Sequence, residues 1–421
     1  MSIFNQYQNI TLNSQQREAI EVIQRFFDSD ESVFILKGYA GSGKTTLLRG
    51  IIKHLKSLNK QVEIMAPTGR AAKVLRDKTG FGKTIHSSIY NFEKLVSIKS
   101  ESIIEGKQSF KYLFPIRQSD DVGRYIIIDE SSMLSSRESK NELFDFGTNI
   151  LLNDVLTYAQ LPTHNNKIIF VGDPAQLPPV GDNESKALSS NFFTQLGIKT
   201  SEIVLTKVMR QEENLILANS LKMRQAIAAS TITELNLEYD QTSYINLPPE
   251  NFAQKYLEFF PSPELGDGVI ISFSNAQSLN YNHAIRKMIY PDGHKMESGD
   301  ILMVVNNNYH SYGTEIFNGD MIKVMAVNNE KTFFRHVPVF VEKAGKSVKE
   351  IVKLEFNTIS FRIDGYPEEI EALVLGSMLD DHKSNLSITE MRALYIDFVI
   401  RFNEKQAKRK EAGLMACKPG S

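Results

Sequence analysis

A glycine-rich loop near the start of the chain constrains the fold more than any other feature of the sequence. The loop GYAGSGKT, from Gly38 to Thr45, follows the short apolar stretch 33–36 and precedes TTLLRGIIKHLKSL, whose apolar residues have helical spacing. It fills every fixed position of the phosphate-binding pattern G-x-x-x-x-G-K-[ST]. Glycines let backbone N–H groups close around phosphate, and the helix adds the partial positive charge of its N-terminus. The order strand, loop and helix therefore predicts an α/β fold of the P-loop type that binds a nucleoside triphosphate.

The side chains of this loop suggest individual roles. We expect Lys44 to contact the β- and γ-phosphates and the Thr45 hydroxyl to coordinate Mg²⁺. The residues expected to line the nucleotide are Gly38, Ala40, Gly41, Ser42, Gly43, Lys44, Thr45 and Thr46.

A second apolar stretch, III at 126–128, is followed by a pair of acids, Asp129 and Glu130. Asp129 at the end of such a strand can hold Mg²⁺ opposite Thr45, and the adjacent Glu130 can polarise the attacking water as a general base. A lone acid pair after a strand is a weak signal, but beside a complete phosphate loop it predicts hydrolysis of ATP or another nucleoside triphosphate.

A third apolar stretch, KIIFV, continues directly into GDPAQLPPVG at 172–181. Proline cannot donate a hydrogen bond to a sheet, so the strand must end there in a stiff loop. In open α/β sheets this edge is where ligands bind. We expect Gln176 to hydrogen-bond the γ-phosphate or the attacking water and so to sense the nucleotide. Two roles remain open for Asp173, namely capping of the loop or a place in the water network.

Composition limits the class of protein and its compartment. The 421 residues predict two to four domains, and an apolar fraction of 42% with 23% charged residues is ordinary for a soluble globular protein. No apolar run approaches the roughly 20 residues of a membrane span. The single cysteine, Cys417, excludes an internal disulfide framework and a cysteine-rich zinc site, which fits a reducing cytoplasm. A net charge of −2 excludes a uniformly basic coat on nucleic acid, but not a locally basic channel.

Seven segments together resemble one family. In chain order they are LNSQQREAI (12–20), GYAGSGKT (38–45), APTGRAAKVL (66–75), TIHS (84–87), IIIDESSM (126–133), GDPAQLPPVG (172–181) and LTKVMRQ (205–211). This order is similar to that of the superfamily 1 helicases, and three of the segments resemble the B branch of RecD-like and Dda-like 5′-to-3′ DNA helicases. The resemblance extends from about residue 10 to about residue 325 and implies two RecA-like motor domains, each a parallel sheet with helices on both faces.

The resemblance also implies roles for single residues. Gln16 matches the glutamine that contacts adenine, which favours ATP, and Arg210 matches an arginine that reaches the γ-phosphate. The residues that match the family's contacts to single-stranded DNA are Pro67, Thr68, Gly69, Thr84, His86 and Asn275. A histidine such as His86 is more often packed for structural reasons, and the neighbours of Asn275 are alternatives to it.

The domain organisation follows from the resemblance and from local pattern. Residues 1–200 would form motor domain 1A, with an inserted 1B hairpin at 89–120 in which VSIKSESI and QSFKYLFPI alternate like strands around 105–107. Residues 201–290 would begin domain 2A, 291–385 would form an SH3-like β domain called 2B, and 386–421 would end in a helix. Phe110 or Phe114 of the hairpin could stack on an end base pair, and packing at the hairpin base is an equal alternative.

The last two motifs of the family do not occur in this sequence. His382-Lys383-Ser384 is followed by Asn385 rather than by glutamine, and Ala393-Leu394-Tyr395 lacks the required threonine-arginine. We therefore expect a truncated chain with weak turnover, because hydrolysis in this class needs charge stabilisation from both motor domains.

The resulting prediction is an ATP- and Mg²⁺-dependent 5′-to-3′ DNA helicase of bacterial or phage type, acting on single-stranded DNA and single-strand/duplex junctions. Recombination or replication proteins are the expected protein partners, and a membrane is not. Two alternatives stay open. One is the RecD-type motor subunit of a recombination nuclease, and the other is an ATP-gated binder of single-stranded DNA with little turnover.

Overall fold

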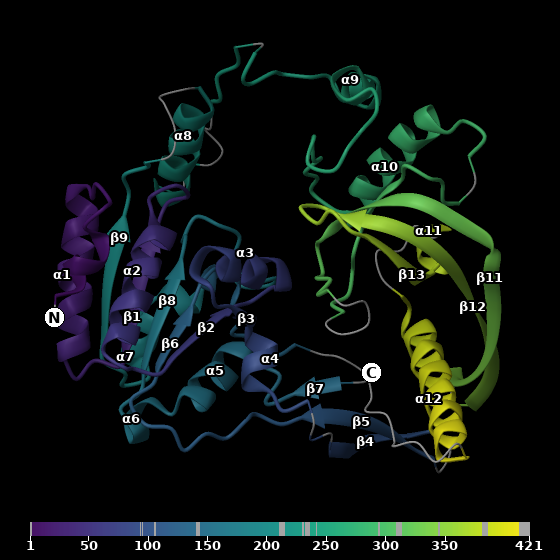
Figure 1. Cartoon of the computed structure of the whole chain (residues 1–421), viewed down its shortest axis with the longest axis horizontal. Helices are drawn as coiled ribbons and strands as arrows, with labels where there is room; N and C mark the ends of the chain where they lie inside the picture. The colour runs from purple at the N-terminus through teal and green to yellow at the C-terminus, as the bar shows by residue number, and fades with distance from the viewer. Residues whose placement is uncertain are drawn as a thin grey trace. The chain divides into compact units, whose positions relative to one another are not determined.

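The computed structural model describes residues 2–92, 94, 96–104, 107–139, 144–209, 215–229, 231, 236–240, 242–293, 295–308, 314–343, 346–380 and 386–411 (Figure 1). The chain forms two compact units. The first comprises Met1–Ile98 with Phe110–Asn246, and the second comprises Lys99–Ser109 with Leu247–Ser421.

A parallel sheet organises the first unit. Its strand order is β3-β2-β6-β8-β1-β9, and every neighbouring pair is parallel. The strands are β1 Val33–Gly38, β2 Val62–Ala66, β3 Lys83–Thr84, β6 Tyr125–Ile128, β8 Lys167–Gly172 and β9 Thr200–Leu205. Because all six point the same way, the loops that follow them meet at one edge of the sheet.

Helices cover both faces of this sheet (Figure 1). Alternate residues of each central strand enter two separate cores: Phe34 and Leu36 pack on one face, whereas Val33 and Ile35 pack on the other. Such strands, buried on both faces, are typical of parallel sheets. The helices are α1 Ser14–Asp28, α2 Lys44–Ser57, α3 Gly69–Thr79, α4 Ile85–Ile89, α5 Leu151–Ala159, α6 Leu161–His164, α7 Ser190–Gln195 and α8 Leu215–Ala229, with 3₁₀ turns η1 Ile3–Tyr7, η2 Ser131–Met133 and η3 Lys186–Leu188. This is the predicted P-loop α/β architecture.

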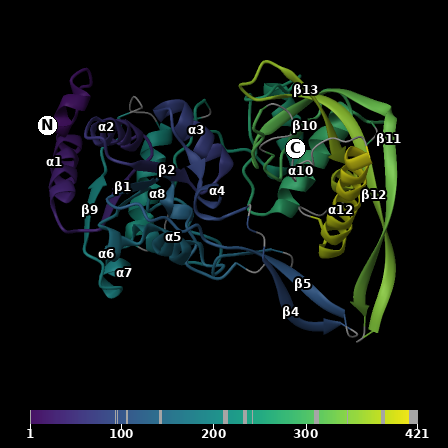
Figure 2. The same cartoon turned by 60° about the horizontal axis from the view of Figure 1, so that its bottom comes forward.

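A hairpin interrupts the first unit after α4 (Figure 2). Its strands β4 Val96–Ile104 and β5 Lys107–Phe114 form a three-stranded sheet with β7 Phe144–Phe146. At its base the Phe114 ring lies 4.9 Å from that of Phe92 and 5.2 Å from that of Phe146, centroid to centroid. Phe114 therefore packs the hairpin base. The side chain of Phe110 and the turn at 105–106 lie outside the described residues.

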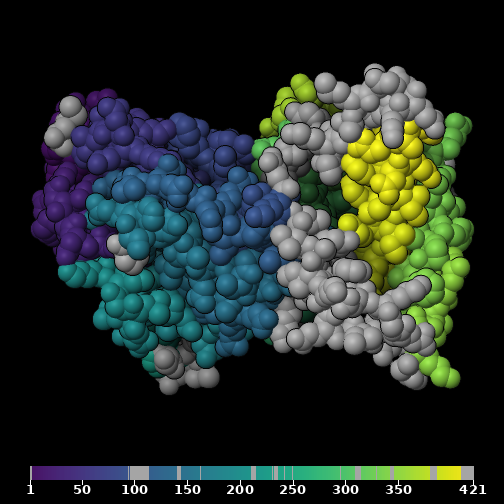
Figure 3. All heavy atoms as spheres, turned by 90° about the horizontal axis from the view of Figure 1, so that it is seen from below, coloured from purple at the N-terminus to yellow at the C-terminus, as the bar shows by residue number. Residues whose placement is uncertain are grey.

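The second unit is built on an antiparallel sheet. Its order is β10-β11-β12-β13, with β10 Ile301–Met303, β11 Met321–Lys343, β12 Lys346–Ile363 and β13 Glu369–Leu375. The helical segments are η5 Pro249–Asn251, α9 Phe252–Phe259, α10 Asn275–Ile289, α11 Ser377–Asp380 and α12 Ile388–Glu411. Ala393 of α12 packs against Val337, Val339 and Leu354 of the long β11–β12 hairpin, while the outer side of α12 lies at the surface (Figure 3).

Two details differ from the sequence-based expectation. The expected boundary at residue 200 coincides with the start of β9, which pairs with β1, and the first unit continues to Asn246. The stretch GVIIS at 268–272 has strand composition but forms no strand, and Val269 and Ile271 are 80% and 92% exposed. Strand composition stabilises a strand only where a neighbouring strand can pair with it, and none of the described strands pairs with this segment.

Candidate active site

The phosphate loop joins β1 to α2 at the carboxyl edge of the parallel sheet. Two of its glycines adopt left-handed backbone conformations, with φ of 78° at Gly41 and 92° at Gly43. No side chain caps the first turn of α2, so the N–H groups of that turn remain available to an anion. The Ser42 hydroxyl oxygen is buried and has no hydrogen-bond partner in the described part of the chain. A phosphate oxygen would satisfy both features.

The charges of three acids act on Lys44. Its ammonium donates to the carbonyls of Gly38 at 2.6 Å and Tyr39 at 3.0 Å. Burial lowers the pKa of Lys44, and the nearby charges of Asp173, Glu130 and Asp129 oppose that effect. The cationic form is therefore supported by carboxylates that follow β6 and β8, the strands predicted to supply them.

The carboxyl group of Asp129, directly after β6, lies in surroundings that disfavour its ionised form. Burial, and then the charge of Glu130, raise the pKa of Asp129 from 3.8 to about 6. Glu130 itself has a φ of 52°, which is unusual for a residue other than glycine and recurs at functional sites. Two crowded carboxylates of this kind suit a divalent cation. No group of three or more histidine, cysteine, aspartate or glutamate side chains among the described residues forms a metal cage, but Mg²⁺ usually needs only one or two carboxylates besides phosphate oxygens.

The proline-rich loop connects these elements. The Gln176 side-chain oxygen accepts a hydrogen bond of 3.1 Å from the hydroxyl of Ser132 in η2, directly after the acid pair. Asp173 is fully buried. It accepts from the backbone N–H of Ala175 at 3.0 Å, which caps the loop, and from that of Ala40 at 3.1 Å, which ties the loop to the phosphate loop. Capping was one of the two roles left open for this residue.

Gln16 is placed against the phosphate loop as well. It forms a capping box with Asn13 at the start of α1, and its side-chain amide donates to the carbonyl of Ser42 at 3.1 Å. The residue is only 4% exposed. Its position beside the loop is compatible with a role near the nucleotide, and its hydrogen bonds also give it a structural role.

The segments expected to contact DNA lie on adjacent strands of the same sheet. β2 pairs with β3 through Ala66 and Thr84, which brings Pro67, Thr68 and Gly69 beside the start of α4. The Thr68 hydroxyl caps α3 through the N–H of Ala71.

The hydroxyl of Thr84 caps α4 in the same way, accepting from the N–H of Ser87 at 3.2 Å. The His86 ring packs 5.4 Å from Tyr90 and 5.5 Å from Phe146, and burial lowers its pKa. The packing of His86 is thus that of a structural histidine.

Two other predicted residues are not among the described residues of the first unit. Asn275 begins α10 in the second unit and is exposed. Arg210 lies outside the described residues.

Sequence reasoning missed one residue of the site. Arg224 of α8 forms two hydrogen bonds with the carboxylate of Asp173, at 2.9 and 2.7 Å. Nothing in the local sequence of α8 distinguishes this arginine from a solvated one, so only the three-dimensional structure identifies it.

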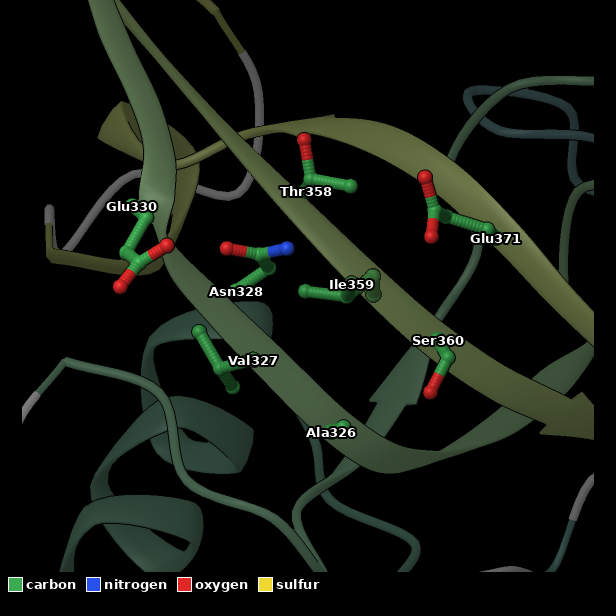
Figure 4. Close-up of a pocket in the computed structure, with 8 residues that line it drawn as sticks. All are labelled: Ala326, Val327, Asn328, Glu330, Thr358, Ile359, Ser360 and Glu371. Carbon is green, nitrogen blue, oxygen red and sulfur yellow. The ribbon is translucent and has the colours of Figure 1, made fainter.

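An open hollow of about 420 Å³ lies in the second unit, where β11 and β12 separate around a register shift (Figure 4). Its lining includes Glu330 and Glu371, and none of the described residues that line it is basic. An acidic hollow does not suit a phosphate, and the edge of the parallel sheet remains the candidate nucleotide site.

A family of AAA domains matches residues 11–242, more than half of the chain and most of the first unit. The chain belongs to this family. The matched AAA domain contains the whole edge of the parallel sheet, from Gln16 to Arg224.

Curated relatives extend the similarity. An uncharacterized protein, R530, of Acanthamoeba polyphaga mimivirus is 26% identical over 356 residues, covering 77% of this chain and 65% of that protein. The ATP-dependent DNA helicase dda of Enterobacteria phage T4 is 24% identical over 347 residues, covering 77% and 70%. The ATP-dependent DNA helicase Pif1 of Bdellovibrio bacteriovorus is 26% identical over 238 residues, covering 55% and 47%. The predicted similarity to superfamily 1B helicases is confirmed, and the chain spans 47% to 70% of these relatives' lengths.

None of the helices in the described part of the chain combines the length and low polarity needed to cross a lipid bilayer.

Proposed function

We propose that this chain is an ATP-dependent DNA helicase that couples ATP hydrolysis to movement on single-stranded DNA, in the 5′-to-3′ direction. The observation that carries the proposal is the edge of the parallel sheet, where Lys44 lies among three acids beside an uncapped helix N-terminus. Similarity to the helicase dda over 77% of the chain supports DNA as the substrate.

The residues of the edge divide the chemistry among them. Lys44 and the first-turn N–H groups of α2 hold the β- and γ-phosphates, and Thr45 with Asp129 would hold Mg²⁺, which when bound neutralises phosphate charge. Glu130 takes a proton from the attacking water, and Gln176 hydrogen-bonds that water or the γ-phosphate. Arg210 contributes further positive charge.

The DNA contacts come from backbone and hydroxyl groups at helix starts. Pro67, Thr68 and Gly69, with the buried Thr84 beside them, would offer such groups to the phosphates of a single strand. Adenine contact by Gln16, strand contact by Asn275, action at single-strand/duplex junctions, cooperation with recombination or replication proteins and a cytoplasmic location belong to the same proposal.

The first test is the steady-state ATPase rate with and without a short single-stranded oligonucleotide. Stimulation by the oligonucleotide is expected in the wild type, and Lys44→Ala should lose at least about 100-fold in turnover because it removes a charge that acts in the transition state. A duplex with a 5′ or a 3′ single-stranded tail then tests direction.

Turnover that ignores the oligonucleotide would overturn coupling to DNA. Binding of both ligands without turnover would instead favour a nucleotide-gated binder of single-stranded DNA. Unwinding from the 3′ tail alone would contradict the proposed direction.

A further inference from the structure

Helix α8 reaches the phosphate loop through one arginine. Both terminal nitrogens of Arg224 donate to Asp173, Nη1 to Oδ1 at 2.9 Å and Nη2 to Oδ2 at 2.7 Å. The Asp173 side chain is fully buried and that of Arg224 is 17% exposed. This fork-to-carboxylate geometry fixes direction as well as distance, which a single charged contact does not.

The same carboxylate holds the phosphate loop. Oδ2 of Asp173, already bonded to Arg224, accepts the backbone N–H of Ala40 at 3.1 Å. The guanidinium of Arg224 also lies 4.2 Å from the centroid of the Tyr39 ring. Two consecutive residues of the loop, 39 and 40, are therefore held from α8, one through Asp173 and one by the arginine directly.

We propose that Arg224 is a positioning residue of the nucleotide site, which fixes the phosphate loop by orienting Asp173 toward Ala40. The inference deepens the proposed function and rests on it, because the loop it positions is the proposed ATP site. Without Arg224, a buried carboxylate would face Ala40 with only N–H partners, and its orientation would no longer be determined by a bidentate pair. The loop would then bind the triphosphate less tightly although every residue of the motif is intact.

The charges around Asp173 give this role a pH signature. Burial alone would raise the pKa of Asp173, but the hydrogen bonds and charge of Arg224, with Ala175 N–H and Lys44, bring it below its ordinary value. The other charged groups that face the site are Asp129 and Glu130 at the end of β6, whose charges also act on Lys44. Removing Arg224 leaves burial as the main influence, so the pKa of Asp173 rises. Its carboxylate then takes up a proton at a higher pH than in the wild type, and the protonated group holds Ala40 less strongly.

The test is the dissociation constant of a fluorescent ATP analogue, mant-ATP, measured with Mg²⁺ from pH 6 to pH 8 as the ratio of variant to wild type. Taking this ratio cancels the titration of the nucleotide and of Asp129. Arg224→Gln should weaken binding about tenfold at pH 8, which corresponds to about 1.4 kcal/mol, and should weaken it further at pH 6. Arg224→Lys, which keeps the charge without the fork, should bind more weakly than wild type by a factor that does not change with pH.

Two further variants complete the design. Lys222→Gln removes another cation of α8, the exposed partner of Glu238, and should bind like wild type. Asp173→Asn combined with Arg224→Gln has no titrating carboxylate at this position, so its ratio should stay constant with pH.

The outcomes separate the two proposals. Wild type that does not bind mant-ATP would overturn the proposed function. Wild type that binds, with Arg224→Gln binding equally well or weaker by the same factor at every pH, would overturn the role of Arg224 while leaving the function standing. If circular dichroism shows that Arg224→Gln is unfolded, Arg224→Lys decides, and affinity equal to wild type refutes the inference.

Discussion

Replacing Gly43 by alanine tests how tightly the phosphate loop is packed against α1. Gly43 has a φ of 92°, and a Cβ added there would lie 2.3 Å from Nε2 of Gln16. That nitrogen donates to the carbonyl of Ser42, and the amide oxygen of Gln16 accepts from Asn13 N–H at 3.1 Å. The new methyl group therefore requires an unfavourable backbone conformation and also displaces an amide that is hydrogen-bonded at both ends.

The two costs can be estimated separately. The left-handed conformation costs a residue with a Cβ about 1–2 kcal/mol. Breaking the Gln16–Ser42 hydrogen bond leaves a buried carbonyl unpaired, at about 1–3 kcal/mol. The free energy of unfolding of the first unit should fall by about 2–5 kcal/mol in total, and at about 2–4 °C per kcal/mol for a unit of this size the melting temperature should fall by roughly 10 °C.

The chain offers a matched control. Gly80 ends α3 with a φ of 80°, and nothing lies within 4 Å of a Cβ placed there, so Gly80→Ala carries the backbone cost alone. Thermal unfolding followed by circular dichroism should show the larger loss for Gly43→Ala. In a Gln16→Ala background the excess should disappear, because the displaced amide is gone. Equal melting temperatures for the two glycine variants would refute the packing described for Gln16.

Two further predictions concern buried charges. The raised pKa of Asp129 means that the folded state binds a proton more tightly than the unfolded state, so stability should decrease by about 3 kcal/mol as the pH rises from about 4 to about 6. Urea unfolding across this range with EDTA should show the slope in wild type and not in Asp129→Asn, and equal slopes would contradict the assignment. Lys167→Met should lower the free energy of unfolding by about 3 kcal/mol, since the buried ammonium donates to the backbone carbonyls of Phe26, Ser29 and Glu31 at and just after the end of α1, and its loss removes all three charged hydrogen bonds. Lys199→Met, which removes only an exposed pair with Asp30, should leave the free energy of unfolding nearly unchanged, and an equal loss in both variants would show that the carbonyls do not depend on Lys167.

The candidate nucleotide site can be predicted from the sequence because its signals are local. A phosphate loop needs glycines and a following helix within a few residues, and the acids after β6 and β8 need only a buried strand before them. Because the strands are parallel, their carboxyl ends lie at one edge of the sheet, and no additional sequence signal is needed to bring these residues together. The residue pattern alone therefore predicts that Lys44, Asp129 and Asp173 lie near one another.

Other features depend on contacts that the local sequence does not contain. Arg224 lies 51 residues after its partner Asp173, on a helix whose sequence gives no sign of the pairing. β9 joins the first sheet because it pairs with β1, a choice of neighbour that composition does not determine. The segment 268–272 has the composition of a strand and yet forms none. In each case the outcome depends on whether two segments that are distant in the sequence pair with each other, and local residue patterns do not predict such pairing.

The charges at the edge of the sheet explain why one arginine matters there. Asp129, Glu130 and Asp173 outnumber Lys44 in its surroundings, so a triphosphate would meet carboxylates as well as the lysine. By pairing with Asp173, Arg224 neutralises the acid that contacts the phosphate loop and leaves Asp129 and Glu130 as the acids available to a divalent cation. Lys44 can then act on phosphate rather than on a neighbouring carboxylate. In the proposed function, the ion pair therefore divides three similar acids into one that would hold the loop and two that would serve the chemistry. Their positions after two neighbouring strands would not create this distinction by themselves.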